Sequence, residues 1–325
     1  LILVLAAAWS LTELETSNDS GDAVVIDVPP PAAGTRLSLD AAAPGREDGA
    51  QGAADSAVMA PAPQPDLVEQ GPYGLLPKIA SDGREPWQVY ARPSDVRDTR
   101  PRIAIVITEI GLSTAASQEA IRHLPPTVTL SVDPYSAQPD EWAPKARGVG
   151  HEILLSLPLE SDEFPFRDAG PMALLTSRTV EENIERLQRV LGRCTGYVGV
   201  SSAFGRRFEQ DEASLRPVLE FIGRRGLIYV GSDASKITLA PDDGDETEFP
   251  IITVDVWIDD EATPHGIDRA LAQLEARARE RGVAVGLARN YPLMVARLAA
   301  WTAALEKKDI ALVPISAVVG RQLLP

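Results

Sequence analysis

The chain has 325 residues, of which 44% are hydrophobic, and its formal net charge is −16 at pH 7. This charge argues against binding to nucleic acid and against docking on an anionic membrane through a basic patch. The single cysteine, Cys194, excludes an intrachain disulfide. The three histidines show no metal-ligand spacing such as H-x-x-x-H, and we expect them to be exposed or to cap helices; they are His123, His151 and His265.

Residues 1–12 begin with the apolar run LILVLAAAWSL, which is too short to span a bilayer. Two interpretations remain open for it: the remnant of an uncleaved membrane anchor, or the apolar core of a signal peptide. Either would place the rest of the chain outside the cytoplasm. We therefore expect a periplasmic or cell-envelope protein that is tethered to the inner membrane through its N-terminus.

Two segments of different composition follow. Residues 13–65 are rich in Ala, Pro, Gly, Asp and Ser and contain few residues that could bury area, which predicts a disordered tether. In residues 66–93, large apolar side chains stand between Gly and Pro. This pattern predicts an irregular arm that packs on a folded body through Tyr73, Trp87 and Tyr90.

From Arg102 onward, short apolar runs alternate with helical patterns, within a folded domain predicted for residues 66–325. The alternation predicts an α/β fold with a parallel sheet that is closed or nearly closed into a barrel. The predicted strands are Ile103–Ile107, Thr127–Val132, Glu152–Leu155, Tyr197–Val200, Leu227–Val230, Ile251–Val254, Val283–Leu287 and Ala311–Pro314. The predicted helices are Ala115–His123, Trp142–Arg147, Val180–Leu191, Glu212–Arg225, Ile267–Arg281 and Leu293–Lys307.

In a parallel barrel, the functional residues lie at the carboxyl ends of the strands. Simple solvation explains many polar residues at such ends. We expect Glu109, Asp233 and Arg289 to converge on one mouth, because they are the charged residues whose strands would meet there. The polar residues at the predicted strand ends are Thr108, Glu109, Asp133, Ser156, Ser201, Ser202, Ser232, Asp233, Asp255, Arg289 and Asn290.

Several stretches of the sequence stand in a specific order and spacing. They include PRIAIVITEIGLS, LPPTVTLSVDPYS, GHEILLSLPLE, YVGVSSAFGRRF, RRGLIYVGSDAS and RNYPLMVARLAAWTAALEKKDIALVPIS. From about Asp66 to the end, the chain resembles the divergent polysaccharide deacetylases of bacteria. The resemblance implies a deformed (β/α) barrel of seven or eight mostly parallel strands, an envelope setting, and descent from metal-dependent amide hydrolases of N-acetylated sugars.

The residues that carry chemistry in this family are replaced here. Family members typically read I-D-D-L-G at the first strand, where the first Asp is the expected general base and the second a metal ligand. Thr108 and Glu109 occupy these two positions. Glu109 keeps a carboxylate that could bind metal, whereas Thr108 cannot act as a base near neutral pH.

The histidines of the family are replaced as well. The His of the L-H-L-P-M stretch falls on Ser156, that of N-N-H-M-G on Ala203, and that of G-H-P-Y-P on Arg289. Where the family reads V-D-S, this chain reads V-G-S and ends the stretch at Ser232, so another carboxylate of the family is lost. Zinc hydrolysis needs two or three nitrogen or carboxylate ligands and an open position for water. The sequence therefore predicts a pseudoenzyme, or a site that works without this metal.

Two hypotheses follow. In the first, the barrel mouth binds an envelope glycan or a protein partner without turnover and without a cofactor, and Arg289 supplies a fixed positive charge that suits a carboxylate or phosphate. In the second, the protein is an active carbohydrate N-deacetylase or hydrolase that holds a divalent cation such as Mg²⁺ or Ca²⁺ through Glu109, Asp133 or Asp233. The residues expected to bind a ligand are Glu109, Asp133, Ser156, Ser201, Ser202, Asp233 and Arg289.

Overall fold

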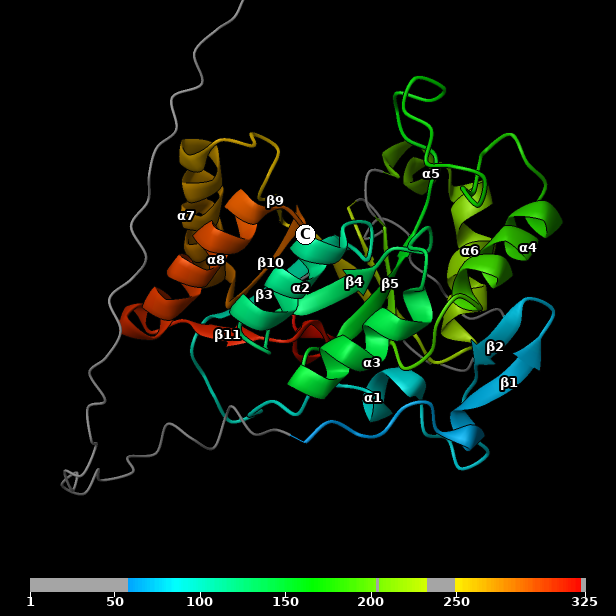
Figure 1. Ribbon diagram of the computed structural model, residues 1–325, viewed down its shortest axis with the longest axis horizontal. Coiled ribbons are helices and arrows are strands. Elements are labelled where there is room, and N and C mark those ends of the chain that lie inside the picture. Colours follow the sequence, from blue (N-terminus) through cyan, green and yellow to red (C-terminus); the bar gives the residue numbers. More distant parts are fainter. Residues whose placement is uncertain (1–57, 203–204, 233–248, 323–325) are drawn as a thin grey trace, which may run out of the picture. The chain divides into compact units, whose positions relative to one another are not determined.

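The computed structural model describes residues 58–202, 205–232 and 249–322 of the chain (Figure 1). Its main feature is a nine-stranded sheet with the strand order β8-β7-β6-β5-β4-β3-β10-β9, in which β11 also pairs with β3. Each of these strand pairs runs parallel. The strands are β3 (Arg102–Ile110), β4 (Thr129–Val132), β5 (Ile153–Leu157), β6 (Gly199–Ser202), β7 (Ile228–Gly231), β8 (Ile251–Thr253), β9 (Val256–Trp257), β10 (Val283–Arg289) and β11 (Ala311–Val313).

The two edge strands of this sheet, β8 and β9, belong to one stretch of chain. The backbone N–H of Val254 donates to the carbonyl of Gly231 at the end of β7, and the next N–H, from Asp255, donates to the carbonyl of Val285 in β10, both at 2.8 Å. Residues 251–258 therefore pair first with β7 and then with β10. This transfer links the two edges of the sheet through a continuous stretch of backbone, and the curved parallel sheet confirms the predicted deformed barrel.

Helices cover the outside of the barrel. In Figure 1, α7 and α8 lie to one side of the sheet, α4 and α6 lie to the other, and α2 and α3 lie in front. Several of these helices begin at a residue whose polar side chain caps the helix N-terminus. Thr179 and Glu182, for example, form a capping box at the start of α4. The helices are α1 (Pro86–Val89), α2 (Thr114–His123), α3 (Pro139–Val149), α4 (Val180–Leu191), α5 (Arg206–Gln210), α6 (Glu212–Gly223), α7 (Pro264–Arg281) and α8 (Pro292–Leu305).

Alternation along the strands divides the core into two clusters. In β3, Ile103, Ile105 and Ile107 belong to the cluster that includes the helices, whereas Ala104 and Val106 belong to the cluster inside the barrel. Because side chains of a strand alternate between faces, this pattern places Thr108 on the inner side at the end of β3. The same reasoning brings residues from the ends of β4, β5, β6 and β10 to the inner side of one mouth.

The arm before the barrel is ordered and contacts the folded body through the three predicted aromatic residues, which differ in how deeply they are buried. Tyr90 is 1% exposed, and Trp87 is half-buried against the inner cluster. Tyr73 remains exposed, although its hydroxyl donates to Glu185 and its ring lies 4.3 Å from the guanidinium of Arg189 on α4. Tyr73 therefore contacts α4 from an exposed position, through its hydroxyl and the face of its ring.

The arm is also less irregular and begins earlier than predicted. It contains the antiparallel hairpin of β1 (Val68–Gly71) and β2 (Gly74–Pro77) and the short helix α1. Arg147 of α3 fixes the start of the arm by donating to the carbonyl oxygens of Ala60, at 2.6 Å, and Tyr90, at 2.9 Å. The predicted anchor, residues 1–12, and most of the predicted tether lie outside the described residues. None of the helices that the structure describes is long and apolar enough to cross a membrane.

One histidine differs from its predicted setting. His123 and His265 are exposed at a helix end and a helix start, as predicted. His151 was expected to be exposed or capping, but its side chain is fully buried. Its ring nitrogens lie 2.8 Å from the carbonyl of Val128 and 3.3 Å from that of Ile121, and burial lowers its pKa. This residue is a structural link at the amino end of the barrel.

Candidate functional site

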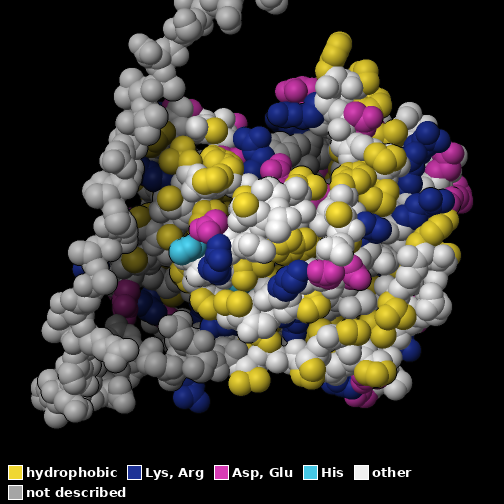
Figure 2. Space-filling view, viewed as in Figure 1, with side chains coloured by type: hydrophobic (Ala, Val, Ile, Leu, Met, Phe, Trp, Pro, Cys, Tyr) yellow, Lys and Arg dark blue, Asp and Glu magenta, His cyan; other side chains and the backbone are white. Residues whose placement is uncertain are grey.

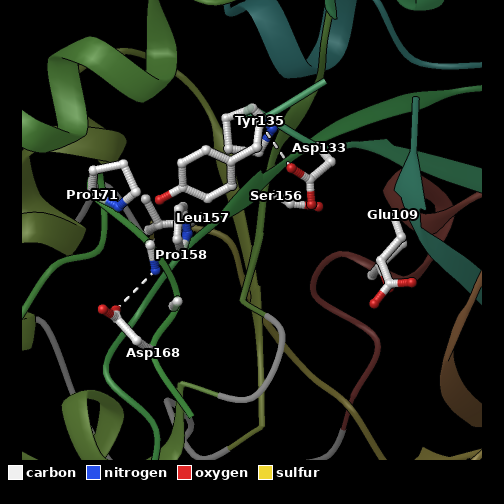
Figure 3. Close-up of a pocket in the computed structure, with 12 residues that line it drawn as sticks. Glu109, Asp133, Tyr135, Ser156, Leu157, Pro158, Asp168 and Pro171 are labelled. Carbon is white, nitrogen blue, oxygen red and sulfur yellow. Dashed lines mark hydrogen bonds between the residues drawn. The ribbon is translucent and has the colours of Figure 1, made fainter. Parts of the chain in front are cut away.

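The first pocket, called the mouth pocket here, opens at the carboxyl ends of β3, β4 and β5 and has a volume of about 330 Å³ (Figure 3). A connection that leaves β5 completes its wall on the opposite side. Hydrophobic and aromatic groups form much of this lining, and three carboxylates face it. The lining residues are Thr108, Glu109, Asp133, Pro134, Tyr135, Ser156, Leu157, Pro158, Asp168, Ala169, Gly170 and Pro171.

Glu109 reaches this pocket because the end of β3 is irregular. The pairing of β3 with β4 shifts register between Ile107 and Ile110, and Glu109 has a φ of 65°, in the left-handed region that non-glycine residues rarely adopt. In Figure 3 its carboxylate stands apart from that of Asp133 across the pocket. Both carboxylates, which the sequence places after predicted strands, line the mouth pocket.

Burial affects both carboxylates. Loss of solvent raises the pKa of Glu109, an effect that the nearby positive charge of Arg289 partly offsets and that Asp133 and Asp259 reinforce. Burial also raises the pKa of Asp133, whose carboxylate accepts a hydrogen bond from the backbone N–H of Tyr135 at 2.8 Å. Perturbed carboxyl groups in one pocket are typical of functional sites, although structural networks also produce them.

The serines at the mouth form a chain of hydrogen bonds. Ser131 Oγ lies 2.8 Å from Ser156 Oγ and 2.7 Å from Ser201 Oγ, so the three hydroxyls satisfy one another across β4, β5 and β6. Ser156 also lines the mouth pocket, whereas Ser201 and Ser202 are buried and belong to neither pocket lining. Of the three predicted serines, only Ser156 stands where a ligand in a pocket could touch it.

A second pocket of about 570 Å³, called the side pocket here, lies beside the first. Arg289 at the end of β10 faces it, and its Nε donates to Asp259 Oδ2 at 2.6 Å. Asp259 is only 2% exposed, and this bond raises the pKa of Arg289 further. The lining residues are Ser161, Asp162, Glu163, Arg167, Arg206, Ser232, Val254, Trp257, Asp259, Asp260 and Arg289.

Two further predicted strand-end residues have structural partners. The carboxylate of Asp255 accepts from the N–H of Val285 at 2.8 Å and pairs with Arg277, so it supports the transfer between β8 and β9 and lines neither pocket. Ser232 donates its hydroxyl to the buried carboxylate of Glu209 on α5. The predicted site residue Asp233 lies outside the described residues, as does Ala203.

Among the pocket residues that the sequence did not reveal, Asp259, Tyr135 and Trp257 matter most for the site. Asp259 follows the apolar run of β9 and could have been found as a strand-end acid, had the strand been extended beyond Val254. Tyr135 accepts a hydrogen bond from the N–H of Met172 at 2.9 Å and thereby holds the wall of the mouth pocket. Trp257 lines the side pocket from β9.

The residues at the family's catalytic positions do not fit a zinc site. The Thr108 hydroxyl donates to the carbonyl of Ala288 at 3.3 Å, and Arg289 places a cation where the family has a histidine. A positive charge beside Glu109 opposes a metal ion there. Within residues 58–202, 205–232 and 249–322, no group of three or more His, Cys, Asp or Glu side chains could hold a metal ion.

The comparisons with known proteins agree with this architecture. The model of the divergent polysaccharide deacetylase family matches residues 105–319, which is more than half of the chain. The chain belongs to this family. It is 24% identical over 205 residues to the uncharacterized protein YibQ of Escherichia coli (strain K12), a match that covers 60% of each chain.

A solved relative supports the same conclusion. The crystal structure of an uncharacterized protein from Agrobacterium tumefaciens C58 superposes with a TM-score of 0.70 and 37% sequence identity. The match covers 76% of this chain and 100% of that one. The fold of this family member is therefore shared with a relative known from experiment.

Proposed function

We propose that this family member is an envelope protein that has lost the metal-dependent catalytic site and binds a glycan at the barrel mouth without cleaving it. The observation that carries the proposal is the ion pair of Arg289 with the buried Asp259. A guanidinium fixed in this way stands at a position where the family carries a histidine. Its fixed positive charge would attract a carboxylate or phosphate on a ligand.

The chemistry of the remaining positions supports loss of turnover. A working deacetylase uses a cation to lower the pKa of a bound water, a base to take its proton, and an acid to protonate the departing amine. The hydroxyl of Thr108 cannot act as that base at neutral pH. Asp259 holds the pKa of Arg289 above its already high ordinary value, so Arg289 cannot serve as the acid.

A second candidate function keeps some activity. Glu109 and Asp133 line one pocket, and burial raises the pKa of each. Carboxyl groups of this kind could serve an atypical carbohydrate hydrolase, with acid–base chemistry or a hard cation held by oxygen ligands. This function is the weaker candidate, because the positive charge of Arg289 opposes a cation close to Glu109.

Metal content and acetate release test the proposal. We expect purified protein to carry no stoichiometric zinc by elemental analysis and to release no acetate from N-acetylglucosamine oligomers. The variant Thr108→Asp, Glu109→Asp, Ser156→His, Ala203→His, Arg289→His restores the family pattern and should raise zinc affinity before it raises activity. Tight zinc binding by the unaltered protein, with acetate release that Glu109→Ala abolishes, would overturn the proposal.

Binding is tested separately with chitin and peptidoglycan fragments in calorimetric titrations. Arg289→Met should weaken the binding of fragments that carry a carboxylate more than that of neutral fragments. The control is Arg122→Met, on the exposed side of α2, which should change neither. Equal weakening of neutral and acidic fragments by Arg289→Met would contradict the proposed role of its charge.

We also propose an envelope location with attachment to the inner membrane, supported by the apolar run in residues 1–12. Fractionation of cells that express the full chain should recover it with the membrane. Recovery in the cytoplasm would contradict this part of the proposal.

A further inference from the structure

The connection between β5 and α4, residues 158–179, is long for a barrel loop and is folded on itself. Loops of this length without regular structure are uncommon in compact domains and often functional. Its base is fixed by Glu160, which is 3% exposed. The Glu160 carboxylate accepts from the N–H and hydroxyl of Thr176, at 2.6 and 2.8 Å, and pairs with Arg207 at 3.1 Å.

The far leg of this connection is fixed as well. Gly170 has a φ of 92° and lies so close to the ring of Tyr135 that a Cβ there would stand 2.7 Å from the ring. The N–H of Met172 donates to the hydroxyl of the same Tyr135. The far leg is therefore held by Tyr135 of the barrel mouth, whereas the base is held by Glu160 and by Arg207 of α5.

The tip is held by its own hydrogen bonds. The hydroxyl of Ser161 donates to the carbonyl of Arg167 at 2.8 Å, and the N–H of Arg167 donates to the carbonyl of Glu163 at 3.1 Å. Phe166 lies in this closed tip and is 98% exposed. Its ring adds nothing to the core, although burying such a side chain would stabilise the fold by about 1.5–3 kcal/mol.

Single exposed apolar residues are common on protein surfaces, but the place of Phe166 is special. Glu163 and Arg167, on either side of it in the sequence, line the side pocket, and residues 168–171 line the mouth pocket. In Figure 1 the connection rises above α5. Figure 2 shows hydrophobic side chains on top of this projection, with basic and acidic side chains beside it.

We propose that Phe166 is a ligand-contacting residue on which a glycan chain stacks where it passes between the two pockets. The inference rests on the proposed function and deepens it, because it requires an oligosaccharide that is longer than one pocket. Pyranose rings present an apolar C–H face, and a rigid aromatic ring is a suitable partner for such a face. The neighbouring sugars then occupy the mouth pocket and the side pocket.

A membrane is the less suitable occupant for this tip. Asp162 pairs with Arg206 at 3.8 Å and Glu163 pairs with Arg167 at 3.9 Å, and Asp168 adds a further negative charge close in the sequence. The tip therefore has no excess of positive charge that would attract it to anionic lipid headgroups. One phenyl ring also supplies little apolar area for membrane binding. A neutral or mixed-charge glycan meets neither obstacle.

The test compares Phe166→Ala, Phe166→Trp and the control Val96→Ala. Val96 is also an exposed apolar residue, at 71%, but lines neither pocket. The probes are N-acetylglucosamine oligomers and peptidoglycan fragments of increasing length, titrated by calorimetry. Phe166→Ala should leave the melting temperature unchanged and weaken the binding of long fragments about five- to tenfold, in the range of other aromatic stacking contacts. Phe166→Trp should retain affinity, Val96→Ala should have no effect, and the shortest fragments should bind all variants equally.

The outcomes separate this inference from the proposed function. Wild-type binding of long fragments that Phe166→Ala leaves unchanged would overturn the inference alone. No binding of any fragment by the wild-type protein would overturn both. A third outcome is that the wild type co-sediments with phosphatidylglycerol vesicles, that Phe166→Ala abolishes this, and that glycan affinity is unchanged. The ligand of Phe166 would then be a membrane, and the inference would be overturned.

Discussion

Removing the guanidinium of Arg289 should destabilise the barrel, because its partner Asp259 is buried. In Arg289→Met an apolar side chain of similar length replaces the cation, and the Asp259 carboxylate, at 2% exposure, loses the donor that stands 2.6 Å away. Breaking a fully buried ion pair costs about 3–5 kcal/mol. The Arg289 side chain is 34% exposed, so solvent compensates part of this loss, and we expect about 2 kcal/mol.

Thermal and urea unfolding, followed by circular dichroism, measure this loss. A destabilisation of about 2 kcal/mol lowers the melting temperature of a domain of this size by about 4–8 °C. The matched control is Arg206→Met in the same pocket. Arg206 pairs with Asp162 at 3.8 Å, and both side chains are more than half exposed, so its removal should cost about 0–1 kcal/mol.

The double variant Arg289→Met, Asp259→Asn tests whether the unpaired charge of Asp259 causes the loss of stability. Since asparagine removes the unpaired charge, the double variant should unfold at a higher temperature than Arg289→Met alone. We expect a coupling free energy of at least about 1 kcal/mol. An unchanged melting temperature for Arg289→Met, or additive effects of the two substitutions, would refute the reasoning.

Three further perturbations test other parts of the structure. Because burial raises the pKa of Glu109 above its ordinary value of 4.5, the stability that its protonated form contributes is present below pH 4.5 and is lost as the pH rises. Glu109→Gln should therefore have a higher free energy of unfolding than the wild type at neutral pH and lose this advantage below pH 4.5. Urea unfolding at several pH values measures the difference, and a difference that does not depend on pH would contradict this prediction. Gly170→Ala should lower the melting temperature more than Gly83→Ala. Both glycines have a positive φ, but a Cβ at Gly170 would clash with Tyr135, whereas no atom lies within 4 Å of the Cβ position at Gly83. Trp87→Ala should cost about 1–2 kcal/mol in the free energy of unfolding, and an unchanged value would argue against packing of the arm.

Local sequence patterns were sufficient for most of the barrel. The run from Ile103 to Ile107 is buried on both faces of β3, as an unbroken β-branched run indicates. The predicted strand Ile251–Val254 contains β8, but β9 (Val256–Trp257) was missed, because Asp255 interrupts the apolar pattern between the two strands. The carboxylate of Asp255 is satisfied by the N–H of Val285 on β10, a contact that no local pattern reveals.

The candidate site was predictable only where strands end. Thr108, Ser156 and Arg289 were found because parallel strands bring their carboxyl ends together. Phe166 and Tyr135 lie on connections, and tertiary hydrogen bonds decide where these run. His151 was misplaced for a similar reason, since carbonyl groups of α2 and of the residue before β4 satisfy its ring.

The parallel pairing of β3 with β10 has a consequence for synthesis of the protein. The hydroxyl of Thr108 on β3 donates to the carbonyl of Ala288 on β10, although 180 residues separate them in the chain. A growing chain therefore presents one edge of β3 without its partner until nearly the whole domain has left the ribosome. Unpaired apolar edges of this kind recruit other strands, so nascent or truncated chains that end before β10 should be aggregation-prone and depend on chaperones, whereas the finished barrel covers this edge.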